Sequence, residues 1–123
     1  MANATDLEKL SAEAAQQGIK LGKVNPGGRK RPDGVVLTWK LTDLSTAVAD
    51  RIVPGFIDWG ETPHPARSSA QGAHLVDFRA EHPNPEPVQR MLKQLGIDLP
   101  VQAGPQPALI ATIVGPKGQI ELR

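Results

Sequence analysis

The 123-residue sequence has no cysteine and no tyrosine, and it has only two tryptophans and two phenylalanines. Without cysteine, the chain has no disulfide framework, no thiolate zinc site and no cysteine nucleophile. No apolar run reaches the roughly 20 residues of a membrane-spanning helix, and the polar N-terminal segment is unlike a signal peptide. The formal net charge is +1 without a basic stripe, so the electrostatic footprint of a nucleic-acid-binding protein is missing. We expect a cytoplasmic protein that binds neither nucleic acid nor a membrane.

Two helices are predicted from the spacing of apolar residues. Thr5 and Glu8 have the spacing of a capping box, which predicts a first helix over residues 6–17. The second helix follows Asn84, its predicted N-cap, and its apolar residues recur at intervals of three and four. Gly96 ends this helix, and we expect a positive φ there because glycine has no side chain to clash in the left-handed region.

Strands are predicted where apolar and polar residues alternate or where short apolar runs occur. The clearest alternation places every second side chain from Val35 to Leu41 on one face. Residues 22–34, which precede this strand, are rich in turn residues, and Gly34 is expected to close the turn with a positive φ. Further strands are expected within residues 51–60, 74–82, 108–114 and 119–123, and the repeat described below allows a poor strand at about 19–24 and at about 99–104.

The order of these elements suggests an internal repeat. The first helix ends in GIKL from Gly18, the second ends in GIDL from Gly96, and strands follow both. A strand precedes only the second helix, so the predicted order is α-β-β-β in the first half and β-α-β-β-β in the second. We therefore expect an incomplete first module at residues 1–60, a linker at 61–72 and a complete module at 73–123, together one compact domain.

Several blocks of the sequence resemble the glyoxalase-like proteins of the vicinal-oxygen-chelate superfamily, which are bacterial proteins of mostly unassigned activity. The blocks are RKRPDGVVLTWKL, VPGFIDWGETPHP, RAEHPNPEPVQRMLKQLG and GPKGQIELR, at residues 29–41, 53–65, 79–96 and 115–123. The resemblance implies an α+β fold of paired β-α-β-β-β modules, with a curved mixed sheet and helices on its outer face. Relatives of this kind usually carry a further module ahead of this region, and here the first module lacks its opening strand.

The same resemblance implies a small-molecule ligand in the concave face of the sheet. Trp39, Phe56 and Trp59 are the candidates for an apolar cavity, although core packing is the alternative role for each of them. Arg31, at the end of a short basic run, is the candidate for an anion contact or else a solvated turn residue. The alternative function is that of a metal-dependent lyase or dioxygenase, and no catalytic residue is assigned.

Metal-binding members of the superfamily place one ligand on the first strand of a module. The matching position here is Asp77, seven residues before the predicted cap Asn84, and not His74. Because side chains alternate along a strand, His74 should face away from Asp77 unless a bulge intervenes.

If a metal binds, we expect Asp77, Glu121 and Asp58 to hold it, since carboxylates suit a hard divalent cation. The favoured alternative is that no metal binds and that these acids are solvated or paired with Arg79 or Arg123.

The remaining polar candidates do not form a catalytic group. His64 lies between prolines in the linker, and His82 lies at the corner between a strand and a helix. Ser68 and Ser69 have no acid–base partner in the pattern, so a hydrolase triad is not indicated.

A module without its opening strand would leave one edge of its sheet unpaired. Such an edge is a template for pairing with another chain. We therefore expect a homodimer with two-fold symmetry, in which the partner covers the gap.

Overall fold

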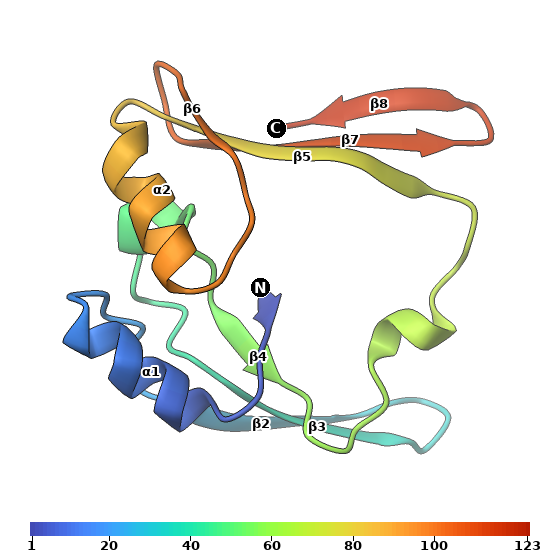
Figure 1. Cartoon of the computed structure of the whole chain (residues 1–123). Helices are drawn as coiled ribbons and strands as arrows, with labels where there is room; N and C mark the ends of the chain where they lie inside the picture. Colours follow the sequence, from blue (N-terminus) through green and yellow to red (C-terminus); the bar gives the residue numbers. More distant parts are fainter. The chain divides into compact units, whose positions relative to one another are not determined.

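The computed structural model describes residues 1–123 and has two helices and eight strands, an α+β fold as predicted (Figure 1). The strands form two mixed sheets of four strands each. In chain order the elements are β1 Ala2–Asn3, α1 Leu7–Gln16, β2 Asn25–Lys30, β3 Val36–Leu41, η1 Val48–Arg51, β4 Phe56–Asp58, η2 Pro65–Ser68, β5 His74–His82, α2 Pro85–Gln94, β6 Val101–Ala103, β7 Ala108–Gly115 and β8 Gly118–Leu122. The chain divides into two compact units, unit 1 (Met1–Val48 and Pro54–Ser69) and unit 2 (Ala49–Val53 and Ala70–Arg123).

Unit 1 has the strand order β1-β4-β3-β2, in which β1 is parallel to β4. The prediction that this module lacks its opening strand is therefore wrong. The strand is present as Ala2–Asn3, paired with Phe56 and Ile57 of β4. A strand of two residues has no alternation to reveal it, which is why the sequence pattern missed it.

Helix α1 packs on the face of the unit 1 sheet that carries Phe56 and Lys40. Leu7 and Ala14 of the helix are buried, and the Glu8 carboxylate accepts a hydrogen bond from Lys40 Nζ at 3.0 Å. The helix begins one residue later than predicted because Asp6, not Thr5, is the N-cap, and the Asp6 carboxylate accepts from Lys9 N–H.

Strand β2 was not expected, since residues 22–34 were interpreted as turns. It is an edge strand paired antiparallel with β3, from Asn25 opposite Leu41 to Lys30 opposite Val36. An edge strand tolerates proline because its outer N–H groups need no partner, and Pro26 occupies such a strand. The composition of residues 25–30 therefore did not indicate a strand, and only their pairing with β3 shows it. The turn after it has the expected positive φ, 87° at Gly34.

Unit 2 has the strand order β6-β5-β7-β8. Helix α2 connects β5 to its parallel neighbour β6, as a parallel pair requires a crossover connection. Val88 and Leu92 of α2 are buried, and Gly96 follows its end with φ 73°, as predicted. Asn84 is the N-cap residue by position, but its side chain makes no capping hydrogen bond.

A short segment from the first half of the chain belongs to unit 2. This segment, Ala49–Val53, contributes the buried side chains of Ile52 and Val53. Its backbone has positive φ at Ala49, Asp50 and Arg51. Asp50 Oδ2 lies 2.9 Å from His82 Nε2, so this pair holds the segment to the end of β5.

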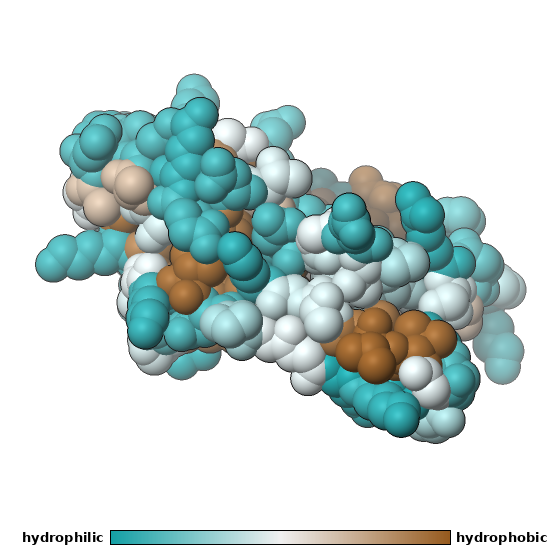
Figure 2. Space-filling model, turned by 90° about the horizontal axis from the view of Figure 1, so that it is seen from below, coloured by the Kyte–Doolittle hydropathy of each residue, from teal (hydrophilic) through white to brown (hydrophobic).

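The surface retains large apolar side chains, and Figure 2 shows them gathered in patches between hydrophilic ones on the face it draws. In unit 2, strand register places the exposed residues Leu75, Phe78, Ile120 and Leu122 on one face of the sheet. Neither helix has the length and apolar character needed to cross a membrane.

Candidate functional site

The two tryptophans of the chain meet in unit 1. Trp39 lies on β3 and Trp59 directly follows β4, and their ring centroids are 5.5 Å apart with ring planes at 63°. The register of β3 and β4 places Leu41 opposite Ile57, so Trp39 shares its sheet face with Ile57. Antiparallel pairing therefore brings together two aromatic side chains that are 20 positions apart in the sequence.

Gly27 on β2 makes room for the first of these rings. It lies directly opposite Trp39 in the register, and a Cβ atom built on Gly27 would come within 2.3 Å of Trp39 Nε1. The neighbouring Gly28 has no such restriction, since its nearest contact would be Leu37 O at 3.4 Å. A side chain at position 27 would thus displace the indole, whereas one at position 28 would not.

Both indoles line one cleft of about 500 Å³, which we call the Trp39–Trp59 cleft. Its charged lining residues are Lys40, Asp58 and Glu61. The full lining is Pro26, Gly27, Thr38, Trp39, Lys40, Asp58, Trp59, Gly60 and Glu61.

A second cleft, of about 620 Å³, lies beside Trp59. It shares Asp58, Trp59, Gly60 and Glu61 with the first cleft and adds His64 and Arg67. The His64 ring contacts Trp59 edge-on, with ring centroids 5.7 Å apart. Its Nδ1 accepts a hydrogen bond from Ala66 N–H, so the other ring nitrogen carries the proton in the neutral form. The prediction placed His64 in a linker without a role, and the structure places it against the candidate site.

Trp59 carries a buried donor without a partner. Its indole Nε1–H is shielded from solvent and makes no hydrogen bond within the protein. A buried donor left unpaired costs about 1–3 kcal/mol. An acceptor that reached this N–H after a small turn of the ring would remove that cost.

Lys40, the one cationic residue that lines the Trp39–Trp59 cleft, is paired with a residue outside the cleft. Lys40 forms an ion pair with Glu8 of α1, and the hydrogen bond from Lys40 lowers the pKa of the Glu8 carboxyl. The same hydrogen bond raises the pKa of Lys40, and the charge of Asp58 raises it further. Asp58 accepts from Gly60 N–H at 2.8 Å, which fixes the turn between β4 and the acid Glu61.

The other two predicted ligand contacts lie away from this cleft. Phe56 is buried at 3% exposure, and the register places it on the opposite sheet face from Ile57, on the side of α1. Arg31 pairs with Asp33 at 2.7 Å within the turn between β2 and β3. Of the four candidates, the structure brings together only Trp39 and Trp59.

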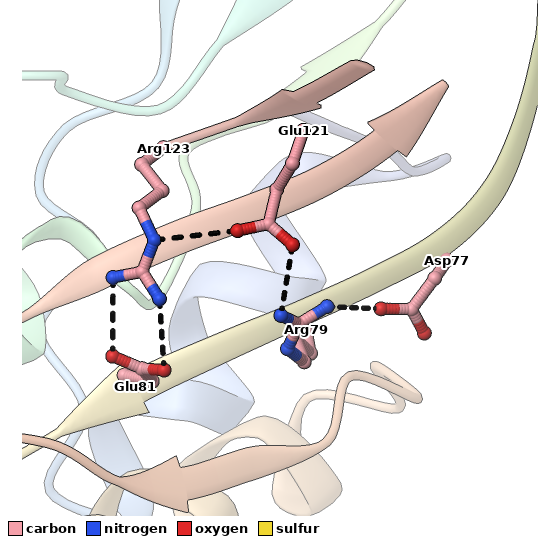
Figure 3. Close-up of polar contacts among 5 residues, drawn as sticks. All are labelled: Asp77, Arg79, Glu81, Glu121 and Arg123. Carbon is pink, nitrogen blue, oxygen red and sulfur yellow. Dashed lines mark hydrogen bonds and ion pairs between the residues drawn. The ribbon is translucent and has the colours of Figure 1, made fainter. Parts of the chain in front are cut away.

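The acids predicted as metal ligands in unit 2 are engaged by arginines (Figure 3). Arg79 hydrogen-bonds Asp77 and lies 3.2 Å from Glu121, and these two hydrogen bonds raise the pKa of Arg79. Arg123 bridges Glu121 to Glu81 along the same face.

This arrangement is the ion-paired alternative, and its donor set does not fit a divalent metal. A guanidinium stands between the two carboxylates where the cation would be. The third predicted ligand, Asp58, belongs to unit 1. No group of three or more histidine, aspartate or glutamate side chains in the chain could hold a metal ion.

Strand β5 contains the bulge that the prediction for His74 named as its exception, so His74 does not face away from Asp77. The register shifts between Leu75 and Asp77, so His74 lies opposite Val114 while Asp77 lies opposite Thr112. Val114 and Thr112 share a face of β7, and so His74 and Asp77 share a face of β5. Strand alternation without the bulge gave the opposite answer, and nothing in the residue pattern marks its position.

The remaining polar candidates have structural partners. His82 Nδ1 accepts from Asn84 N–H at 3.0 Å, which fits the predicted corner role. The hydroxyls of Ser68 and Ser69 both donate to the Pro65 carbonyl. The charged residues and the histidine that line the clefts, and that the sequence prediction did not name as ligand contacts, are Lys40, Glu61, His64 and Arg67; only their proximity to Trp59 in sequence or across the sheet would have indicated them.

Comparison with known proteins bears on this region directly. A family model described as a glyoxalase-like domain matches residues 1–96, well over half of the chain. The matched range contains all of unit 1 and therefore both clefts. No curated protein and no solved structure matches the chain.

Proposed function

Because the chain belongs to the glyoxalase-like domain family of the vicinal-oxygen-chelate superfamily, we propose that it binds a small organic molecule in the Trp39–Trp59 cleft. The observation that carries the proposal is the meeting of both tryptophans on one concave surface. Ligand pockets are typically apolar and aromatic clefts with a few placed polar groups. This cleft is lined by two tryptophans and by the charged residues Lys40, Asp58 and Glu61.

Two further features support this role over simple core packing. Trp39 and Trp59 are partly exposed, whereas the core residue Phe56 is not. The unpaired indole N–H of Trp59 offers a donor to an acceptor on the ligand.

The experiment uses the fact that the chain has two tryptophans and no tyrosine. Intrinsic fluorescence therefore reports almost entirely on the cleft. We expect members of a panel of neutral, anionic and cationic aromatic and alkyl fragments to change this fluorescence saturably. The same fragments should shift both indole N–H signals in a ¹H–¹⁵N correlation spectrum.

Two substitutions test whether the fragments bind in the Trp39–Trp59 cleft. Trp39→Phe should weaken every fragment that binds the cleft, while the matched control Phe78→Leu, on the exposed sheet face of unit 2, should leave binding unchanged. Fragments that shift only signals of unit 2, or no saturable response from the whole panel, would contradict the proposal.

A further inference from the structure

The charged residues that line the Trp39–Trp59 cleft leave an excess of negative charge. Glu61 lines the cleft without an ion-pair partner, whereas Asp58 lies opposite Lys40 in the strand register and shares its sheet face, away from Trp39. The single lining cation, Lys40, is committed to Glu8 at 3.0 Å. A ligand of the cleft therefore meets a negative potential, which favours a positive group.

The orientation of the indoles restricts the shape of that group. At 63° between ring planes, the two rings cannot sandwich one flat ligand. They form instead two walls of a corner, which surrounds a compact, rounded group. A cation over the face of a tryptophan is attracted by the ring quadrupole, and indole is the strongest of the natural partners.

We infer that the ligand of the Trp39–Trp59 cleft carries a compact organic cation, of the class of methylated ammonium groups, seated in the corner that the faces of the two indoles form, with Glu61 as its counter-charge. The inference rests on the proposed function and names the chemical class of its ligand. The His64 and Arg67 side of Trp59 then receives the remainder of the molecule, where the lining carries both signs of charge.

A pair of isosteric probes tests the charge separately from the shape. Choline carries a trimethylammonium group, and 3,3-dimethylbutan-1-ol carries a neutral tert-butyl group of the same size on the same hydroxyethyl tail. Each is titrated into the full chain at constant ionic strength, with sodium chloride replacing choline chloride, while tryptophan fluorescence and the two indole N–H signals are followed. We expect choline to bind about tenfold more tightly than the neutral isostere.

Two charge variants assign the preference to the cleft. Glu61→Gln should reduce the affinity for choline severalfold and leave the affinity for the neutral isostere unchanged. Glu86→Gln removes the same charge from an exposed position on α2 and should change neither affinity.

The outcomes separate this inference from the proposed function. Equal or tighter binding of the neutral isostere would overturn the cation while leaving a binding cleft in place. A choline affinity that Glu61→Gln does not change would likewise overturn it. If neither probe binds at millimolar concentration, the inference fails, and the fragment panel decides the proposed function by itself.

Discussion

Units 1 and 2 share one element order and differ in how the strands pair. Each has an opening strand, a ten-residue helix and three further strands. In unit 1 the opening strand β1 has two residues and lies at the edge, next to the last strand β4. In unit 2 the opening strand β5 has nine residues and lies inside the sheet, between β6 and β7. The same opening element is therefore an edge strand in unit 1 and a central strand in unit 2.

The two units also differ in the chemistry of their exposed surfaces. Unit 1 carries both tryptophans and the two clefts described above, whose acids Asp58 and Glu61 have no arginine partners. Unit 2 carries five charged side chains that form ion pairs with one another across β5 and β8. Acids that are already paired leave little free charge for a ligand, so the comparison directs the search for function to unit 1.

The largest expected effect is on the molecular mass in solution, because the edge strands of the two units differ in how they are protected against pairing with another chain. Among the four edge strands, β1 and β6 are very short and β2 contains Pro26, whereas all five residues of β8 are exposed. The opening strand of unit 1 is present, so the gap on which the expected homodimer depended does not exist; we propose instead that a homodimer forms through β8, an edge strand without a proline or a bulge. Sedimentation at micromolar concentration should give the mass of a dimer, and Ile120→Lys should reduce it to that of a monomer. A monomer mass for the unchanged chain would contradict the dimer.

Core substitutions test whether each unit has its own core. Leu7 of α1 and Leu92 of α2 are both fully buried, so replacing either by alanine should cost about 2–5 kcal/mol in the free energy of unfolding. Leu7→Ala should shift the denaturation midpoint observed by tryptophan fluorescence, which reports on unit 1. A fluorescence midpoint that Leu7→Ala leaves unchanged would show that α1 does not support the tryptophan-bearing sheet.

Adjacent glycines on β2 sharpen the account of the cleft. Gly27→Ala should displace the Trp39 indole, lower the free energy of unfolding by about 1–3 kcal/mol and alter the fluorescence spectrum. Gly28→Ala, where a Cβ atom meets only ordinary contacts, is the matched control and should change neither. Equal effects at both positions would mean that the contact with Trp39 is not what restricts position 27.

The sequence predicted those parts of the fold that local patterns encode. Alternation found β3, apolar spacing found α2, and turn chemistry found the positive φ of Gly34 and Gly96. Strands β1 and β2 were not predicted, because β1 is too short to show alternation and β2 is rich in glycine and proline.

The candidate site was predictable only in its aromatic part. Trp39 and Trp59 were candidates because large aromatics suit a ligand cavity, and the structure joins them. Phe56 was a candidate for the same reason, but its sheet face depends on the register of β4, which could not be deduced from the sequence pattern. The same limit applied to His74, whose face depends on a bulge.

The smallest expected effect concerns the ion pair beside the cleft. Glu8→Gln removes the carboxylate that holds Lys40, so the ammonium should turn toward Asp58 and weaken the binding of choline, while stability at neutral pH changes little. Because the pKa of Glu8 is lowered in the folded chain, its stabilising contribution is present at neutral pH and is lost as the pH falls through that lowered value. The acid limb of the stability profile should therefore flatten slightly in the variant. An unchanged choline affinity in Glu8→Gln would show that Lys40 does not set the charge of the cleft.

The most direct test of the account is a proton–proton distance measurement between the two indole rings in solution. We expect nuclear Overhauser contacts between ring protons of Trp39 and Trp59, and we expect one added ligand to perturb both rings together. Absence of these contacts, or ligands that perturb one ring and never the other, would contradict the claim that the two tryptophans form a single binding site.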